Sequence, residues 1–291
     1  MKIIVKEINI IEKLKSIRFA KMHGLGNDFM IIDARKIELN IDSYLVKALS
    51  NRNLGVGFDQ LAVIYEPIAT TADCLLKFWN NDGSVSPTCG NASRCIADLL
   101  FQEKKINSAV LETDAGLLQC KIKNGLVSVN MGNPKLAWNE IPLAIECDTL
   151  HLPLEGDPVA TSMGNPHCTF FVKNIDSFDI SEFGHSYEKH QLFPNRTNVQ
   201  IAQIMKNDTI RVKVWERGTG KTLASGSSSC AVAVAAYRRG LTNKTTNIIL
   251  DGGELQIIWS QEGVWMSGET KKVFEGTLSD DFLLGIERST G

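Results

Sequence analysis

The sequence predicts an α+β fold built from two related, pseudo-symmetric halves, and three observations lead to this prediction. The chain has 291 residues, which is enough for about two domains of ordinary size. Short segments rich in β-branched and aromatic residues recur between turn signals, as is typical of strands, whereas few segments have helical periodicity. A weak internal repeat relates the first half of the chain to the second.

The predicted elements are spread over both halves of the chain. Strands are expected at 29–33, 61–65, 75–79, 109–113, 117–122 and 127–131, and again at 168–172, 197–205, 209–215, 247–250, 254–259 and 264–267. Two main helices are expected at 91–102 and 228–239, the second of them capped by Gly240. A further helix is expected at 42–52.

The repeat is clearest at two turns that each lead into a main helix. The first turn is 89–91, Cys-Gly-Asn, and the second is 225–227, Ser-Gly-Ser. Asn27 precedes the first turn by nearly the same spacing as Asn165 precedes the second. We therefore expect a duplicated α+β unit with one principal helix in each copy.

Composition argues against several classes of protein. With 31 Lys+Arg, 33 Asp+Glu and a net charge of -2, the chain lacks the basic excess of a nucleic-acid-binding protein. Its seven cysteines show no CxxC spacing, which predicts neither a zinc site nor a complete disulfide framework and fits free thiols in a reducing cytoplasm. Apolar stretches are too short to span a membrane, and charges within 1–17 interrupt any signal-peptide core. We expect a cytoplasmic enzyme or binding protein with a small-molecule or protein partner.

The turns at 89 and 225 have a chemical interpretation. At a helix N-terminus the first N–H groups lack helical partners and the helix dipole adds positive character, so anions bind there. A cysteine in that position is stabilised as the thiolate, which makes Cys89 a candidate base. If the two copies face each other, residues 89 and 225 lie on opposite sides of one ligand. An α-amino acid suits this arrangement, because the turns can hold its carboxylate while one group removes the α proton and the other returns one.

Several motifs resemble those of the diaminopimelate epimerase family. They lie at 19–29, 57–60, 80–84, 89–91, 164–167, 216–218 and 253–255. The resemblance implies two domains of diaminopimelate-epimerase-like fold, each a β-barrel-like sheet around a central helix. It places the domains at 1–133, completed by 273–291, and at 134–272, with the active site in the interdomain cleft.

The resemblance also implies an activity. The family interconverts L,L-diaminopimelate and meso-diaminopimelate by two-base proton transfer at the α carbon, in the bacterial route to lysine and peptidoglycan. This chemistry implies no cofactor and no metal. The implied partners are the amino-acid substrate diaminopimelate and a second copy of the chain in a homodimer, with no nucleic acid and no membrane.

Site residues follow from the resemblance position by position. The family's catalytic positions fall on Cys89 and Ser225, with His167 and Glu216 as hydrogen-bonding residues beside the reacting centre. The turns that bind the α-carboxylate fall on Gly90 with Asn91 and on Gly226 with Ser227. The remaining substrate contacts, which hold mainly the remote amino-carboxylate end, fall on Asn27, Gln60, Asn80, Asn165, Asn198, Glu216 and Arg217.

Ser225 departs from the family pattern. Where the family has Leu-Ala-Cys-Gly, this chain has Leu-Ala-Ser-Gly at 223–226. A hydroxyl is a far weaker acid than a thiol, whose free pKa is about 8.5, and no base adjacent in sequence is expected to activate Ser225.

Three interpretations follow from this serine. In the first, the chain is a diaminopimelate epimerase seen as a Cys-to-Ser variant at 225, with reduced activity. In the second, it is a natural one-thiol relative that acts as a racemase or dehydratase on another amino acid. In the third, it is a non-catalytic amino-acid-binding relative. Retention of Cys89, His167, Glu216 and Arg217 favours the first two.

Overall fold

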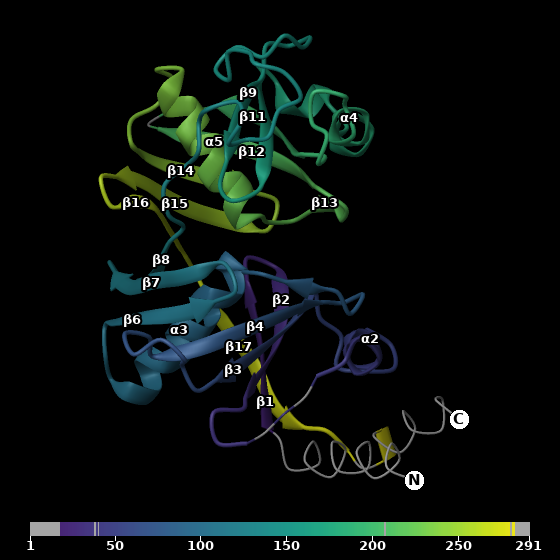
Figure 1. Cartoon of the computed structure of the whole chain (residues 1–291), viewed down its shortest axis with the longest axis vertical. Coiled ribbons are helices and arrows are strands. Elements are labelled where there is room, and N and C mark those ends of the chain that lie inside the picture. The colour runs from purple at the N-terminus through teal and green to yellow at the C-terminus, as the bar shows by residue number, and fades with distance from the viewer. Residues whose placement is uncertain (1–17, 38, 40, 207, 280, 283–291) are drawn as a thin grey trace. The chain divides into compact units, whose positions relative to one another are not determined.

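The computed structural model describes residues 18–37, 39, 41–206, 208–279 and 281–282. Within these residues, strands dominate and four α-helices lie among them, which confirms the predicted α+β class. The chain divides into two compact units, one running up to Lys121 and resuming at Thr270, the other running from Ile122 to Glu269 (Figure 1). The domain boundaries at 133 and 273 stay predictions. None of the described helices has the length and apolar character needed to cross a membrane.

In the part of the first unit that the structure describes, two helices pack against one sheet. Its strands are β1 (Arg18–Gly24), β2 (Asn27–Asp33), β3 (Gln60–Tyr65), β4 (Cys74–Asn80), β5 (Val85–Ser86), β6 (Ser108–Thr113), β7 (Gly116–Lys123) and β17 (Lys271–Thr277). They pair in the order β17–β1–β2–β3–β4–β6–β7, with β5 on β4. Helix α3 (Gly90–Lys104) packs against β1, β2 and β6, and α2 (Ser43–Ser50) packs against β3 and β4.

The second unit has the same organisation. Its strands are β8 (Leu126–Asn130), β9 (Val159–Ser162), β10 (Pro166–Phe171), β11 (Asn198–Ile204), β12 (Thr209–Glu216), β13 (Gly220–Thr222), β14 (Thr245–Leu250), β15 (Gly253–Ser260) and β16 (Gly263–Gly268). They pair in the order β9–β10–β11–β12–β14–β15–β16–β8, with β13 on β12. Helix α5 (Gly226–Arg238) packs against strands of this sheet, while α4 (Ile180–Glu188) and the short 3₁₀ helix η1 (Ile175–Ser177) pack on β11 and β12 (Figure 1).

The two sheets share one pairing scheme, which confirms the predicted duplication. Antiparallel and parallel pairings alternate along β1–β2–β3–β4–β6 and along β9–β10–β11–β12–β14. The registers also agree, because Phe29 faces Gln60 across β2 and β3 just as His167 faces Asn198 across β10 and β11. These residues therefore occupy equivalent positions in the two units.

The main helices are central, because most of their residues are buried. In α5, small residues from Cys230 to Ala236 are all buried, which lets strands approach the helix closely. Helix α5 ends as predicted, since Gly240 has a φ of 68° and its N–H bonds to the carbonyl of Tyr237. Helix α3 likewise buries residues 90–97, so each sheet is filled by the helix that follows one of the predicted turns.

Helix α4 lies outside the predicted elements because a glycine sits in its middle. Gly184 is buried against Trp215 of β12, and a Cβ at this position would lie 2.3 Å from the Cβ and Cγ atoms of that tryptophan. A glycine inside a helix costs about 1 kcal/mol relative to alanine and so weakens the sequence signal for a helix. Here the absence of a side chain lets the helix lie flat on the indole.

Gly184→Ala is therefore expected to destabilise the protein. In an open helix the change stabilises by roughly 0.5–1 kcal/mol, but overpacking at this contact should lower the free energy of unfolding by about 1–3 kcal/mol. Urea denaturation measures the change, with Ser186→Ala on the exposed side of the same helix as the control. An unfolding midpoint as high as that of the control variant would contradict the contact.

Candidate active site

Cys89 is the N-cap residue of α3. Its backbone is extended, with φ -147° and ψ 110°, and its Sγ accepts a hydrogen bond from the N–H of Ala92 at 3.4 Å. The helical ladder begins with Ser93, whose N–H bonds to the carbonyl of Cys89 at 2.9 Å. The N–H groups of Gly90 and Asn91 therefore lie outside the ladder, as an anion-binding turn requires.

The other cysteines differ from Cys89 in their surroundings. None of the seven forms a disulfide, and Cys89 is half-buried at the helix start. Burial raises the pKa of the thiols of Cys74 and Cys95 to about 12 and raises those of Cys120 and Cys168 further. A thiol held in its protonated form is a poor base. Cys89 is the one cysteine of the seven that caps a described helix, and this position supports it as the candidate base.

Four of the predicted substrate contacts in the first unit lie in two hydrogen-bonded pairs. Asn91 Nδ2 donates to Asn27 Oδ1 at 3.2 Å, and Gln60 Nε2 donates to Asn80 Oδ1 at 2.8 Å. Asp59, which precedes Gln60, links the pairs because its Oδ2 accepts from Asn27 Nδ2 at 2.9 Å. The structure thus gathers these residues around the turn that follows Cys89.

A charged cluster next to Asn27 joins the segments around Asp28 and Asp59, and no sequence pattern predicted it. Arg52 donates to both Asp28 and Asp59, while Lys21 donates to Asp28 and to the carbonyl of Gly57. Burial alone would raise the pKa of Asp28, but the bonds from Arg52 and Lys21 hold it at about 2. The available signal was the charge of residues inside motif segments 19–29 and 57–60.

Ser225 occupies the equivalent N-cap position of α5, with φ -140° and ψ 118°. Whereas the Cys89 sulfur accepts from its own helix, Ser225 Oγ donates to Glu216 Oε2 at 2.9 Å. The ladder of α5 begins with the N–H of Ser229, which leaves those of Gly226 and Ser227 outside it. The sequence indicated no base adjacent to Ser225; the fold supplies Glu216 from the end of β12.

The turn after β12 is held by buried amides. Arg217 donates its backbone N–H to Asn198 Oδ1 at 3.0 Å, and Asn198 Nδ2 donates to the carbonyl of Pro166 at 2.9 Å. The Arg217 guanidinium bonds to the carbonyl of Asn195 at 3.0 Å and is otherwise exposed. Both the oxygen and the nitrogen of the Asn198 side-chain amide are therefore bonded within the unit. Its contact with a substrate stays a prediction.

Glu188 of α4 supports the same turn. Its carboxylate accepts from Trp215 Nε1 at 2.8 Å and from the N–H of Gly218 at 3.0 Å. Burial would raise the pKa of Glu188, but these hydrogen bonds hold it below its usual value. Glu188 belongs to helix α4, which was not predicted. Its contact with the turn after β12 could therefore not be inferred from the sequence.

His167 is buried in the second unit as a neutral side chain. Its Nε2 lies 2.9 Å from Asn165 Oδ1, and its Nδ1 lies 3.0 Å from Gln200 Nε2. Burial lowers the pKa of His167 to about 3, with a smaller contribution from the charge of Arg217. A neutral imidazole suits the predicted hydrogen-bonding role.

The buried histidine predicts a loss of stability on acidification. Between pH 6.5 and about 3 the unfolded chain binds a proton at residue 167 that the folded chain does not, so folding is progressively disfavoured as the pH falls through this range. His167→Phe installs the side chain found at the equivalent Phe29. It should make the free energy of unfolding less dependent on pH between 6.5 and about 3. Unfolding free energies measured from pH 8 to 3 test this, and parallel curves below pH 6.5 would contradict it.

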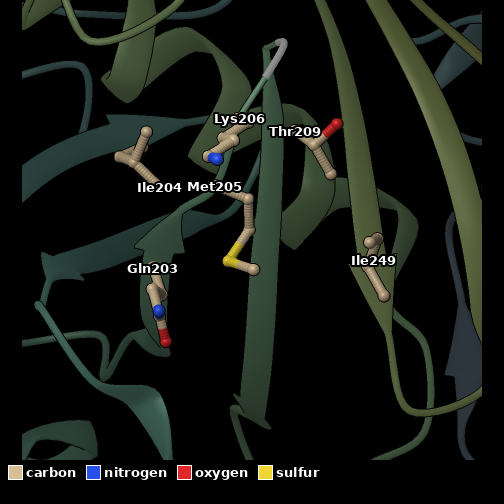
Figure 2. A pocket seen from close by; sticks show the side chains of 6 residues that line it. All are labelled: Gln203, Ile204, Met205, Lys206, Thr209 and Ile249. Atoms are coloured by element: carbon tan, nitrogen blue, oxygen red, sulfur yellow. The ribbon is translucent and has the colours of Figure 1, made fainter.

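The described residues contain no group of three or more His, Cys, Asp and Glu side chains that could hold a metal ion. The second unit has an open hollow of about 590 Å³ (Figure 2). It lies at the far end of β11, roughly 20 Å from Asn198 by strand rise. It is lined by Gln203, Ile204, Met205, Lys206, Thr209 and Ile249. None of these is a predicted site residue, so the hollow is separate from the candidate site.

Comparison with known proteins decides the family. Residues 19–137 and 159–273 match the diaminopimelate epimerase family profile. The chain belongs to the diaminopimelate epimerase family. The diaminopimelate epimerase of Rhodospirillum centenum is 44% identical to it over 92% of this chain and 94% of the relative. That of Acidiphilium cryptum is 46% identical over 89% and 95%. The predicted resemblance is confirmed, and the chain is an enzyme of the isomerase class.

Solved structures share the fold of this family member at low sequence identity. A PhzF-family phenazine biosynthesis protein of Bacillus anthracis aligns with a TM-score of 0.65 at 14% identity, covering 90% of this chain and 99% of that one. A hydroxyproline epimerase from Agrobacterium vitis, with bound trans-4-hydroxy-L-proline, aligns with a TM-score of 0.65 at 13% identity, covering 93% and 94%. The predicted diaminopimelate-epimerase-like fold is thereby confirmed.

Proposed function

We propose that this diaminopimelate epimerase family member interconverts L,L-diaminopimelate and meso-diaminopimelate, a step toward lysine and peptidoglycan precursors. The observation that carries the proposal is a pair of equivalent helix N-termini, capped by Cys89 in one unit and by Ser225 in the other. Stereoinversion needs a proton carrier on each face of the α carbon. These two positions are the proposed carriers.

The substrate α-carboxylate is proposed to bind the turns next to the two caps. The N–H groups of Gly90 and Asn91 and those of Gly226 and Ser227 lie outside their helical ladders. Donors of this kind stabilise the enediolate charge that builds on the carboxylate as the α proton leaves. Cleavage of the C–H bond is thereby favoured without a cofactor.

The proton transfers balance with one thiol, one hydroxyl and one carboxyl group. Cys89 thiolate takes the α proton, so the C–H bond breaks, its electron pair enters the enediolate and an S–H bond forms. Ser225 gives its hydroxyl proton to the opposite face of the α carbon, and Glu216 in its acid form replaces that proton. In the reverse direction, Glu216 carboxylate receives the serine proton. The 2.9 Å bond that Ser225 Oγ donates to Glu216 Oε2 supports the reverse transfer, and the forward transfer is proposed to use the same contact with the proton on Glu216.

Recognition of the remote end is proposed for the polar residues around both turns. The exposed guanidinium of Arg217 suits the remote carboxylate, since its fork can donate two parallel hydrogen bonds. The proposed direct amide contacts are Asn27, Gln60, Asn80 and Asn165. Because both ends of the Asn198 amide are bonded inside the unit, we assign it the indirect role of orienting Arg217.

The test is an assay of the purified chain with L,L-diaminopimelate in deuterated buffer, without pyridoxal phosphate or added metal. The expected product is meso-diaminopimelate with one deuterium at the inverted carbon, detected by chiral chromatography and mass spectrometry. Cys89→Ala is the inactive control. Absence of both inversion and deuterium uptake in the native chain would overturn the proposal.

A one-face reaction is the second candidate, because Ser225 offers a neutral hydroxyl where Cys89 offers a thiol. In that case the chain acts as a racemase or dehydratase on another amino acid. Deuterium would then enter one enantiomer without inversion of diaminopimelate, or an elimination product would form. Binding without exchange or elimination would instead indicate the amino-acid-binding relative.

We further propose that the enzyme works as a homodimer in the cytoplasm without a cofactor. The absence of disulfides among the seven cysteines supports a reducing compartment. Family membership is what supports the dimer. Sedimentation equilibrium should give twice the chain mass of 32.1 kDa, and a monomer mass at micromolar concentration would overturn the dimer.

A further inference from the structure

A buried polar cluster surrounds His167 in the second unit. It consists of His167, Thr169, Gln200 and Ser228, and each of these residues is 0% exposed. Gln200 Nε2 lies 3.0 Å from His167 Nδ1 and 3.1 Å from Ser228 Oγ, while Thr169 Oγ1 lies 3.2 Å from Gln200 Oε1. A buried polar group escapes a large desolvation penalty only where it is hydrogen-bonded, so each member of this cluster depends on its partners within it.

The first unit shows that the fold does not need this cluster. Ile31 pairs with Ala62 in the same register as Thr169 with Gln200, and Phe29 stands at the position of His167. Ala92 follows the Cys89 cap as Ser228 follows the Ser225 cap. The equivalent residues Phe29, Ile31, Ala62 and Ala92 are also buried, and all are apolar. The polar set is therefore a feature of the second unit's site and not a requirement of the architecture.

The hydrogen bonds set the direction of the network. Because Gln200 Nε2 donates to His167 Nδ1, that ring nitrogen is an acceptor and the ring proton resides on Nε2. Nε2–H then donates to Asn165 Oδ1 at 2.9 Å. With Oδ1 occupied, Asn165 offers its Nδ2 hydrogens to a ligand.

We propose that Gln200 is a positioning residue that fixes the Nε2–H tautomer of His167 and thereby makes Asn165 a donor to an anionic group of the substrate. The identity of that group as a diaminopimelate carboxylate rests on the proposed function. The reversed network, with Nδ1–H donating to Gln200 Oε1 and Asn165 Nδ2 donating to Nε2, would turn Asn165 Oδ1 outward and select an ammonium group. Gln200 thus decides which charge the site accepts at Asn165.

Nitrogen-15 NMR of His167 tests the native network directly. The expected result is a protonated Nε2 and an unprotonated Nδ1, with no Overhauser contact between the Asn165 amide protons and the imidazole ring protons. A proton on Nδ1 in the native chain, or amide protons of Asn165 facing the ring, would overturn the proposal. This measurement needs no ligand, so it stands even if diaminopimelate is not the substrate.

Gln200→Glu tests the link to binding, because a carboxylate accepts a proton from Nδ1 and cannot donate to it. Affinity for meso-diaminopimelate, measured by calorimetry, should follow the Nε2 proton. Where Nε2 loses its proton, Asn165 turns and affinity falls about tenfold to a hundredfold, as for a lost hydrogen bond to a charged group. Where the ring becomes doubly protonated, affinity is kept. Native affinity in a variant that has lost the Nε2 proton would overturn the link, and so would weakened binding in a variant that keeps this proton.

Gln203→Glu is the matched control. It makes the same chemical change on the same strand, and Gln203 Oε1 accepts from the N–H of Ile175, a bond that a carboxylate can also accept. The His167 tautomer and the affinity should both stay native. If native protein fails to bind diaminopimelate at all, the proposed function fails, whereas the tautomer and the Asn165 orientation still decide the role of Gln200.

Discussion

Replacing Cys89 with alanine is expected to abolish exchange of the substrate α proton with solvent. A positioned general base typically accelerates proton transfer by about 10²–10⁴-fold, so exchange should fall by at least this factor. The reason is geometric: the sulfur lies at the N-terminus of α3, beside the N–H groups proposed to hold the carboxylate. Deuterium uptake into diaminopimelate measures the effect.

Two further variants separate the chemistry of Cys89 from the general loss of a thiol. Cys147→Ala removes the other half-buried thiol and should leave exchange unchanged. Cys89→Ser keeps an N-cap oxygen for α3 but removes the acidic group, so stability should hold while exchange falls. Native exchange in either Cys89 variant would move the proton-abstracting role to another residue, with Glu216 as the next candidate.

Ser225→Cys is expected to raise the rate of epimerisation by about 10²–10⁴-fold, the contribution typical of one general acid or base. Ser225 and Cys89 have nearly the same cap geometry, with φ of -140° and -147°, so a thiol at 225 enters an orientation already used in the first unit. A thiol releases its proton far more readily than a hydroxyl. Initial rates of L,L to meso conversion measure the gain.

Ser229→Cys is the control for this gain. It places a new thiol one turn further along α5, where the hydroxyl of Ser229 bonds to the carbonyl of Ser225. No increase is expected there. If Ser225→Cys fails to epimerise diaminopimelate but racemises another amino acid, the second of the three interpretations of Ser225 is favoured; if it only binds amino acids, the third is.

Local patterns predicted much of the fold, and long-range contacts explain what they missed. Alternating apolar residues located most strands of both sheets, and the similar turns before α3 and α5 indicated the duplication. Strand β1 was missed because Lys21 interrupts its apolar pattern, and only the structure shows that Asp28 pairs with this lysine. Helix α4 was missed because Gly184 resembles a break until Trp215 is placed beneath it.

The candidate site was also predicted only in part. Motif spacing singled out Cys89 and Ser225, and both are N-cap residues. The bond from Ser225 to Glu216 joins residues from a strand end and a helix start, so neighbouring sequence could not reveal it. Gln200 alternates with apolar residues along β11, a pattern typical of a solvent-facing side chain, yet it is fully buried beside His167.

The return of β17 to β1 has a consequence for synthesis of the chain. The edge strand of the first sheet comes from residues 271–277, while its partner comes from residues 18–24. The second unit is continuous from Ile122 to Glu269, so all of its strands leave the ribosome before β17 does. Domains fold as units during synthesis. The first unit, whose synthesis begins before that of the second, is therefore completed after it. Until then β1 has an open edge, and residues 271–277 must be translated before this edge is covered.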